Sequence, residues 1–210
     1  MRWRDIVTDS DIKHAVNFAA EVLRGNSGGH DISHIRRVMN NARIILDGEK
    51  NSGADANLVL LCCALHDVDD RKIKACDAEE FSRLREFFAN AGLSDRLFEQ
   101  VRDIISHVSY TNNHTKNPAL CIEAQIVQDA DRLDALGAIG IARAFAYGGS
   151  VGRHMYGEGD GTTISHFYDK LLLLPELMNT ATAKRMADER TEFMKEFLTQ
   201  FNTETNDTHI

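Results

Sequence analysis

Hydrophobic side chains recur at helical spacing along most of the chain. Between about residues 10 and 23, for example, Ile12, Val16, Ala19 and Leu23 fall on one face, as the 3.6-residue period requires. The same pattern predicts helices over about residues 31–46, 55–66, 78–91, 94–108, 119–135, 138–147, 164–174 and 181–201. The segment 119–135 either continues or kinks into 138–147. No stretch alternates as a β-strand would, so the sequence predicts an all-α fold.

Glycines interrupt this pattern at several points. Residues 148–161 contain six glycines and show no hydrophobic period, which predicts a mobile loop. Such a loop either closes over a site as a lid or has no role. The 210 residues fit a single domain. We expect its core over about residues 28–148 and a C-terminal helical extension over about residues 162–203.

The composition is that of a globular protein, with 43% hydrophobic and 27% charged residues. A net charge of −8 argues against broad binding to nucleic acid or to a membrane surface. It allows a small anionic substrate, because a divalent cation and a few arginines can reverse the field inside a pocket. The longest apolar runs, of about eight residues, fall short of the ~20 that span a bilayer. The first residues lack the apolar region of a signal peptide, so we expect a cytoplasmic protein.

The four cysteines, Cys62, Cys63, Cys76 and Cys121, form no C-x-x-C pair. Cys62 and Cys63 lie inside the apolar run 58–65. Free cysteines of this kind are usually buried, and the sequence therefore predicts buried, reduced thiols.

Polar residues stand out where they interrupt apolar segments, first of all at His66 and Asp67. This pair ends the most hydrophobic of the predicted helices. A carboxylate there is costly to bury unless it is paired or coordinated to a metal. The alternative is a histidine that caps the helix and an aspartate that faces solvent.

Two further groups of polar residues are candidates for the same site. Asp31 is placed to cap the helix that follows the glycines before it, which puts His34 in the first turn as a candidate ligand or a surface imidazole. Asp129, Asp131 and Asp134 lie between two strongly apolar segments. A solvated acidic helix face explains that position poorly.

The order His34, His66-Asp67, Asp131 resembles the HD superfamily of metal-dependent phosphohydrolases. Flanking stretches extend the resemblance over nearly the whole chain. They are SGGHDISHIRRV, LHDVDDRKI, QDADRLDALGAIGIARAFAYGG and ISHFYDKLLLL. These stretches resemble in particular the small bacterial HD nucleoside triphosphate pyrophosphohydrolases. The resemblance implies an HD-type helical bundle with additional C-terminal helices. It also implies that the metal ligands are His34, His66, Asp67 and Asp131.

Two imidazoles and two carboxylates suit one divalent metal ion. Mn²⁺ is our first expectation; Fe²⁺, Co²⁺, Ni²⁺ and Mg²⁺ also suit this set, whereas Zn²⁺ usually prefers fewer ligands. His107 and His114 lie where two-metal members of the superfamily carry extra histidines. We favour a single metal and interpret His107 as a hydrogen-bonded or pocket-lining imidazole.

Asp70 follows Asp67 by three residues, so on a continuing helical turn it would project to the same side. The resemblance implies that it is the general acid or base. The alternative is a surface carboxylate paired with Arg71 or Lys74. Asp134 and Asp31 are candidate hydrogen-bond partners for a ligand histidine.

Phosphate recognition needs cationic side chains, since guanidinium groups bind phosphate oxygens in pairs. The candidates for substrate binding are Arg37, Arg71, Lys74, Arg132, Arg143, His166 and Lys170. Gly137 and Gly140 lie in no P-loop pattern, and we expect them to allow close helix packing.

The resemblance implies hydrolysis of a (deoxy)nucleoside triphosphate to the monophosphate and pyrophosphate by metal-activated water. The alternatives are a 5′-deoxynucleotidase, a phosphodiesterase and a nucleotide-sensing module without turnover. The expected partner is therefore a small anionic nucleotide, without nucleic acid or membrane. The amphipathic C-terminal helix either packs on its own core or forms a homodimer interface.

Overall fold

The protein is all-α. A computed structural model describes residues 3–25, 31–69, 80–108, 120–157 and 161–206. Within these residues the only β pairing is an isolated bridge between Arg4 and Leu93. The elements, in chain order, are α1 (Asp9–Val22), α2 (Ile32–Gly48), α3 (Ala56–Leu65), α4 (Ser82–Ala91), α5 (Asp95–Ser106), α6 (Ile122–Leu133), α7 (Gly137–Ser150), α8 (Thr163–Asp169), the 3₁₀ helix η2 (Leu171–Leu177) and α9 (Ala181–Asn206).

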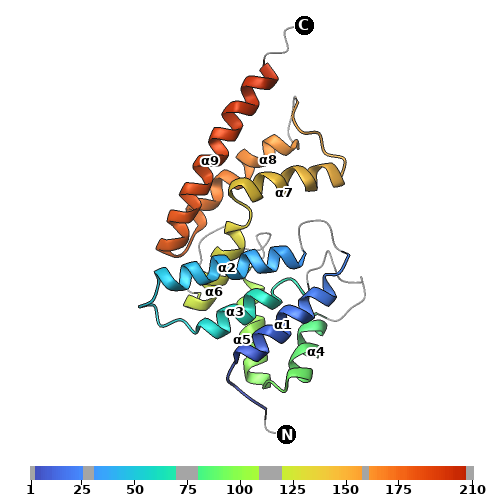
Figure 1. The fold of residues 1–210 in the computed structure, drawn as a ribbon, viewed down its shortest axis with the longest axis vertical. Helices are drawn as coiled ribbons and strands as arrows, with labels where there is room; N and C mark the ends of the chain where they lie inside the picture. The colour runs from blue at the N-terminus through green and yellow to red at the C-terminus, as the bar shows by residue number, and fades with distance from the viewer. Residues whose placement is uncertain (1–2, 26–30, 70–79, 109–119, 158–160, 207–210) are drawn as a thin grey trace.

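Helices α2, α3 and α6 form the centre of the molecule, and each packs against the other two. Helix α3 is the most hydrophobic of the three, and seven of its ten residues are buried. Helices α1, α4 and α5 lie at one end, and α7, α8 and α9 lie at the other (Figure 1). The centre therefore fixes α2, α3 and α6 relative to one another. The polar residues that interrupt the apolar pattern of the sequence lie in these helices or directly before or after them.

Short polar residues begin several of the helices, as the sequence predicts for α2. The Asp31 carboxylate accepts a hydrogen bond from the backbone N–H of His34 at 2.9 Å, which satisfies one of the free donors of the first turn. Asp55 and Ser94 cap α3 and α5 in the same way. Gly92, in the left-handed region at φ 63°, ends α4.

The chain turns sharply between α6 and α7, so the alternative of one continuous helix is wrong. Gly137 has φ +71°, and a Cβ on Gly140 would lie 2.2 Å from the carbonyl oxygen of Ala135. Only glycine allows this approach. Gly137 lies against the side chain of Arg190 in α9, as the expected close helix packing requires, whereas Gly140 allows a close approach within the turn itself.

Two predicted boundaries differ from the structure. Helix α7 continues through Gly148 to Ser150, where a loop was expected. The glycine is required there because a Cβ would lie 2.3 Å from the hydroxyl oxygen of Thr163. The helix expected over 164–174 is divided into α8 and η2 at Lys170, whose φ of −139° and ψ of −58° are not helical. Pro175 lies inside η2.

Helix α9 packs against α7, η2, α6 and α2 of its own chain. Met194 and Leu198 are buried there, whereas Phe193 is 47% exposed. Of the two alternatives for this helix, packing on its own core is observed, and a homodimer interface stays a prediction. None of the described helices combines the length and the apolar character needed to cross a membrane.

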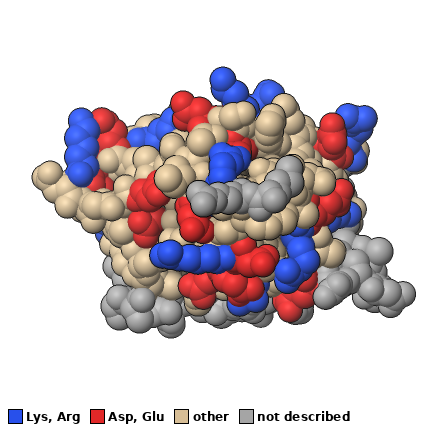
Figure 2. All heavy atoms as spheres, turned by 90° about the horizontal axis from the view of Figure 1, so that it is seen from below, with Lys and Arg blue, Asp and Glu red and all other residues tan. Residues whose placement is uncertain are grey.

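Acidic and basic side chains lie side by side at the end of the molecule formed by α1, α4 and α5 (Figure 2). On the face seen there, the two signs largely offset one another. The net charge of −8 is therefore not gathered on that face.

Candidate metal centre

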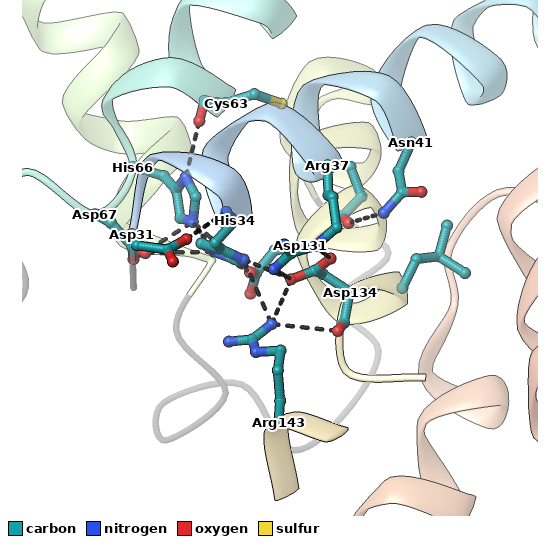
Figure 3. A network of polar contacts seen from close by, with 12 residues as sticks. Asp31, His34, Arg37, Asn41, Cys63, His66, Asp67, Asp131, Asp134 and Arg143 are labelled. Atoms are coloured by element: carbon teal, nitrogen blue, oxygen red, sulfur yellow. Dashed lines mark hydrogen bonds and ion pairs between the residues drawn. The ribbon is translucent and has the colours of Figure 1, made fainter. Parts of the chain in front are cut away.

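Four polar side chains from three regions of the centre converge on one point. His34 comes from the first turn of α2, His66 and Asp67 follow directly after α3, and Asp131 comes from α6 (Figure 3). His34 Nε2 lies 3.2 Å from His66 Nε2, 3.3 Å from Asp67 Oδ2 and 3.4 Å from Asp131 Oδ1. His66 Nε2 lies 3.4 Å from Asp67 Oδ1 and 3.7 Å from Asp131 Oδ1. We refer to these four residues as the polar cluster.

Both imidazoles are held by the nitrogen that points away from the polar cluster. His34 Nδ1 lies 2.7 Å from Asp134 Oδ2, and His66 Nδ1 lies 2.9 Å from the carbonyl oxygen of Cys63. Each Nδ1 therefore donates its proton, which leaves the lone pair of each Nε2 directed into the polar cluster. This arrangement is typical of metal-binding histidines.

Two arginine side chains hold the Asp134 carboxylate in turn. Arg37 forms two parallel bonds with it, Nε to Oδ1 at 2.6 Å and Nη2 to Oδ2 at 2.9 Å. Arg143, from α7, donates from Nη1 to Asp134 Oδ2 at 2.5 Å and to the Asp134 carbonyl oxygen at 3.2 Å. Asn41 Nδ2 also bonds the carbonyl oxygen of Ala130 at 3.0 Å. These contacts fix α2, α6 and α7 around the histidine.

The polar cluster strongly favours added positive charge. Burial opposes protonation of His34, yet its bonds to Asp131, Asp134 and Asp67 raise its pKa well above the usual value. Burial likewise disfavours the charged form of Asp131, but His34 and His66 lower the pKa of that carboxyl. Nitrogen lone pairs and carboxylate oxygens that face one another need a cation between them, either protons or a metal ion.

The donor set and its spacing fit a divalent metal. Donors about 2.1 Å from one ion lie about 3.0 Å apart at right angles and about 3.4 Å apart in a tetrahedron. The distances within the polar cluster are close to these values. The side chains of His34, His66 and Asp67 are at most 8% exposed, whereas that of Asp131 is 29% exposed. The site therefore opens to solvent beside Asp131.

The other expected site residues do not share one location. Asp70, Arg71, Lys74 and His114 lie outside the described residues. Arg37 and Arg143 lie beside the polar cluster, but both are bound to Asp134. Arg132 is 4% exposed, and its guanidinium bonds the carbonyl oxygen of Leu177 at 2.5 Å. Because this contact turns Arg132 toward η2, we do not retain it as a substrate contact.

His166 and Lys170 lie one turn apart at the end of α8. Burial, with Lys170 and Arg153 nearby, lowers the pKa of His166. His166, Lys170 and Arg153 therefore form a local group of side chains that end in nitrogen atoms, and Lys170 and Arg153 are cationic. His107 caps the end of α5, with Nε2 3.9 Å from Asp103 of the same helix, and its carbonyl oxygen accepts a bond from Gln128.

Two expectations about neighbouring residues need correction. Asp31 bonds the backbone of His34, so its role is that of a helix cap, whereas Asp134 is the partner of the ring. Cys62 and Cys63 are buried free thiols, as expected, but Cys121 is exposed because it lies at the start of α6. Cys76 lies outside the described residues.

Sequence reasoning missed two contributions to the site. One is the carbonyl oxygen of Cys63, which orients His66; a backbone group carries no signal in the residue pattern. The other is the pairing of Arg37 and Arg143 with Asp134. The spacing of Arg37 three residues after His34 on α2 places both on one side of the helix, and that could have indicated the first of these pairs.

The chain is similar to known proteins of one family. Residues 31–136 match the HD domain family. The protein YpgQ of Bacillus subtilis is 38% identical over 85% of this chain and 86% of its own length. Its crystal structure in complex with ADP aligns with a TM-score of 0.77 at 35% identity, covering 93% of this chain and 95% of that one.

Two other crystal structures are similar over almost the full length. A Lactobacillus plantarum protein has a TM-score of 0.80 at 36% identity, covering 96% of this chain and 99% of that one. A Bacillus thuringiensis protein described as an HD-superfamily hydrolase has a TM-score of 0.74 at 36% identity, covering 95% and 98%. The matched segment 31–136 contains all four residues of the polar cluster, and this chain belongs to the HD domain family.

Proposed function

We propose that this chain is a metal-dependent phosphohydrolase that converts (deoxy)nucleoside triphosphates to the monophosphate and pyrophosphate. The observation that carries the proposal is the convergence of two Nε2 atoms and two carboxylates, with each imidazole anchored through Nδ1. His34, His66, Asp67 and Asp131 would hold one divalent ion, Mn²⁺ in our first expectation. A bound ion of this kind acidifies water and offsets negative charge on a phosphoryl group.

A nucleotide is the substrate class we propose. The relative YpgQ, 35% identical over 93% of this chain, has been solved in complex with ADP. The exposed side of Asp131 leaves room for an anionic ligand to approach the ion. Among the described residues, Arg143 is 26% exposed and lies next to His34, so a second N–H edge of its guanidinium can reach a phosphate oxygen.

The proposed reaction breaks the bond between the α-phosphorus and the oxygen that bridges to the β-phosphorus. Water attacks the α-phosphorus in line, and pyrophosphate leaves with the bonding electron pair. Asp70, three residues after Asp67 in the sequence, takes the proton of the attacking water. Asp134 and the carbonyl oxygen of Cys63 hold both Nδ1 protons throughout, so His34 and His66 keep their orientation.

The test is a panel of dNTPs, dNMPs and a phosphodiester reporter, incubated with the Mn²⁺-loaded protein. Orthophosphate is assayed with and without added inorganic pyrophosphatase. Phosphate that appears from dNTPs only when pyrophosphatase is present supports the proposal. Phosphate released directly from dNMPs would replace it with a 5′-nucleotidase, and cleavage of the reporter alone would replace it with a phosphodiesterase.

The metal assignment has its own test with a matched pair of variants. His66→Ala should lose bound Mn²⁺, measured by metal analysis after gel filtration, and should lose turnover. His14→Ala removes an exposed histidine of α1 and should keep both. If no divalent metal supports turnover of any substrate while a nucleotide still binds, the chain is a nucleotide-sensing module.

A further inference from the structure

A cavity lies beside the polar cluster, between α2, α9 and the turn that begins α7. Its volume is about 410 Å³, within the range of pockets that hold small molecules. Three arginines line it, Arg36, Arg37 and Arg190, together with Asn40 and Asn41. None of the four residues of the polar cluster is part of its wall.

Asp134 separates the two sites. It contributes to the cavity wall while its Oδ2 faces His34 Nδ1. In Figure 3, Asn41 lies on the side of Asp134 away from His66. A ligand in the cavity would therefore contact arginine and asparagine side chains rather than a metal ion held by the polar cluster.

The wall carries more positive than negative charge. Among the described residues that line it, Asp134 is the one carboxylate, and it is already bonded to Arg37. Arg190 is half-buried and bonds two neutral oxygens, Leu133 O at 2.6 Å and Asn41 Oδ1 at 2.9 Å. Neither Arg36 nor Arg190 forms an ion pair with any residue in the described ranges. Arg36 and Arg190 thus line the cavity with no carboxylate of the described residues within ion-pair distance, and Asp134 acts on Arg190 only at longer range. Such a wall favours an anion.

The start of α7 adds donors to the same wall. Residues 136–139 line the cavity, and no side chain caps this end of the 14-residue helix. The backbone N–H groups of a first helical turn have no partner within the helix, and they carry partial positive charge. Arg190 packs across Gly137, where a Cβ would lie 3.3 Å from its side chain, so the guanidinium is held close to this helix end.

We propose that this cavity binds a small phosphate-bearing anion, at a site separate from the metal centre. Guanidinium groups and helix N–H groups are the donors that phosphate oxygens prefer. The amide of Asn40 and the side chain of Ile139 suit the remainder of an organic phosphate, whereas the Asn41 amide is bonded to Ala130 and Arg190. The shared chemistry is the phosphate group, whether it is free or esterified. The assignment does not depend on the proposed nucleotide hydrolysis.

The test measures binding by isothermal titration calorimetry to the full chain in EDTA, with inorganic phosphate, AMP and adenosine as probes. Phosphate and AMP should bind saturably, and adenosine should bind at least tenfold more weakly than AMP. If AMP binds more tightly than phosphate, the site takes an organic phosphate; equal affinities indicate the free ion. Absence of saturable binding by both phosphate and AMP overturns the proposal.

Variants then locate the binding. Arg36 is exposed, so Arg36→Glu should fold normally by circular dichroism and should weaken phosphate binding about tenfold or more. Arg185→Glu makes the same change in charge at an exposed position of α9 outside the cavity wall, and it should leave binding unchanged. Equal losses in both variants would show a general charge effect and overturn the site.

The His66→Ala variant separates this cavity from the metal centre. It should bind phosphate as the parent chain does, because no cavity contact is altered. Loss of phosphate binding in His66→Ala would place the anion at the polar cluster and overturn the proposal. A failed turnover assay, in contrast, would leave these binding measurements untouched.

Discussion

His34 and Asp134 are 100 residues apart in the sequence, yet His34 Nδ1 lies 2.7 Å from Asp134 Oδ2 in the buried centre of the protein. The same carboxylate is held by Arg37 and Arg143, and the hydrogen bonds of His34 and Arg37 lower the pKa of Asp134 against the effect of burial. A charged Asp134 fixes the tautomer of His34 and makes Nε2 a better metal ligand. Asp134 therefore acts on the metal centre through another residue.

We predict that Asp134→Asn weakens Mn²⁺ binding by about 10- to 100-fold. The amide keeps the shape of the side chain but removes the charge that orients His34 and binds Arg37. Titration calorimetry with Mn²⁺ measures the change. Asp47→Asn, at a carboxylate that is 75% exposed and paired with Lys50, serves as the control. Equal Mn²⁺ affinities in the two variants would contradict the role of Asp134.

Asp70→Ala should separate chemistry from metal binding. If Asp70 handles the proton of the attacking water, its loss should lower kcat by about 10²- to 10⁴-fold. Bound Mn²⁺ should stay at the level of the parent chain, since the four ligands are unchanged. Steady-state rates together with metal analysis check both parts. Full activity in this variant would refute the assigned role.

The polar cluster could be predicted because its residues break an apolar pattern. Asp67 follows seven buried residues of α3, and a carboxylate in that position requires a partner. The capping role of Asp31 could also be predicted, because an N-cap depends on neighbouring residues only. Local rules of this kind determine most of the helix boundaries.

The parts that could not be predicted depend on contacts between distant segments. Gly148 lies within α7 and against Thr163, and no local rule distinguishes it from a glycine that ends a helix. The cavity beside Arg36 forms only when α2, α7 and α9 meet. Arg132 fits the chemistry of phosphate binding, but packing turned it toward Leu177.

The turn between α6 and α7 provides a stability prediction with a matched control. Gly140→Ala would put a Cβ 2.2 Å from the carbonyl oxygen of Ala135, so the backbone must shift. We expect the free energy of unfolding to fall by about 1–3 kcal/mol, measured by urea denaturation. Gly149→Ala lies in the same helix, and no atom of the described residues lies within 4 Å of the added Cβ. It should be neutral or stabilising by up to about 1 kcal/mol, since alanine favours the helix.

Asp11 provides a prediction for pH. Its side chain is 4% exposed and accepts hydrogen bonds from Arg4 at 2.8 Å, from the Thr8 hydroxyl at 2.6 Å and from the Thr8 backbone at 2.9 Å. Burial alone would raise the pKa of Asp11, but these bonds outweigh it and lower the pKa below the usual value of 3.8. The carboxylate both completes the cap of α1 and ties the N-terminal segment to it.

Asp11→Asn should therefore lower the free energy of unfolding by about 1–2 kcal/mol at pH 7. Because the folded pKa lies below the unfolded value of about 3.9, the unfolded chain binds more protons between the two values. The stabilising effect of the carboxylate is fully present above the unfolded pKa and is lost as pH falls through the folded pKa. Urea denaturation of the parent and of Asp11→Asn from pH 7 to pH 3 should thus show a difference in the free energy of unfolding that shrinks as the solution becomes more acidic.

Asp9→Asn, at an exposed carboxylate of the same turn that accepts none of these bonds, should give a smaller difference from the parent at pH 7. A difference between Asp11→Asn and the parent that stays constant down to pH 3 would mean that the charge of Asp11 does not stabilise the fold.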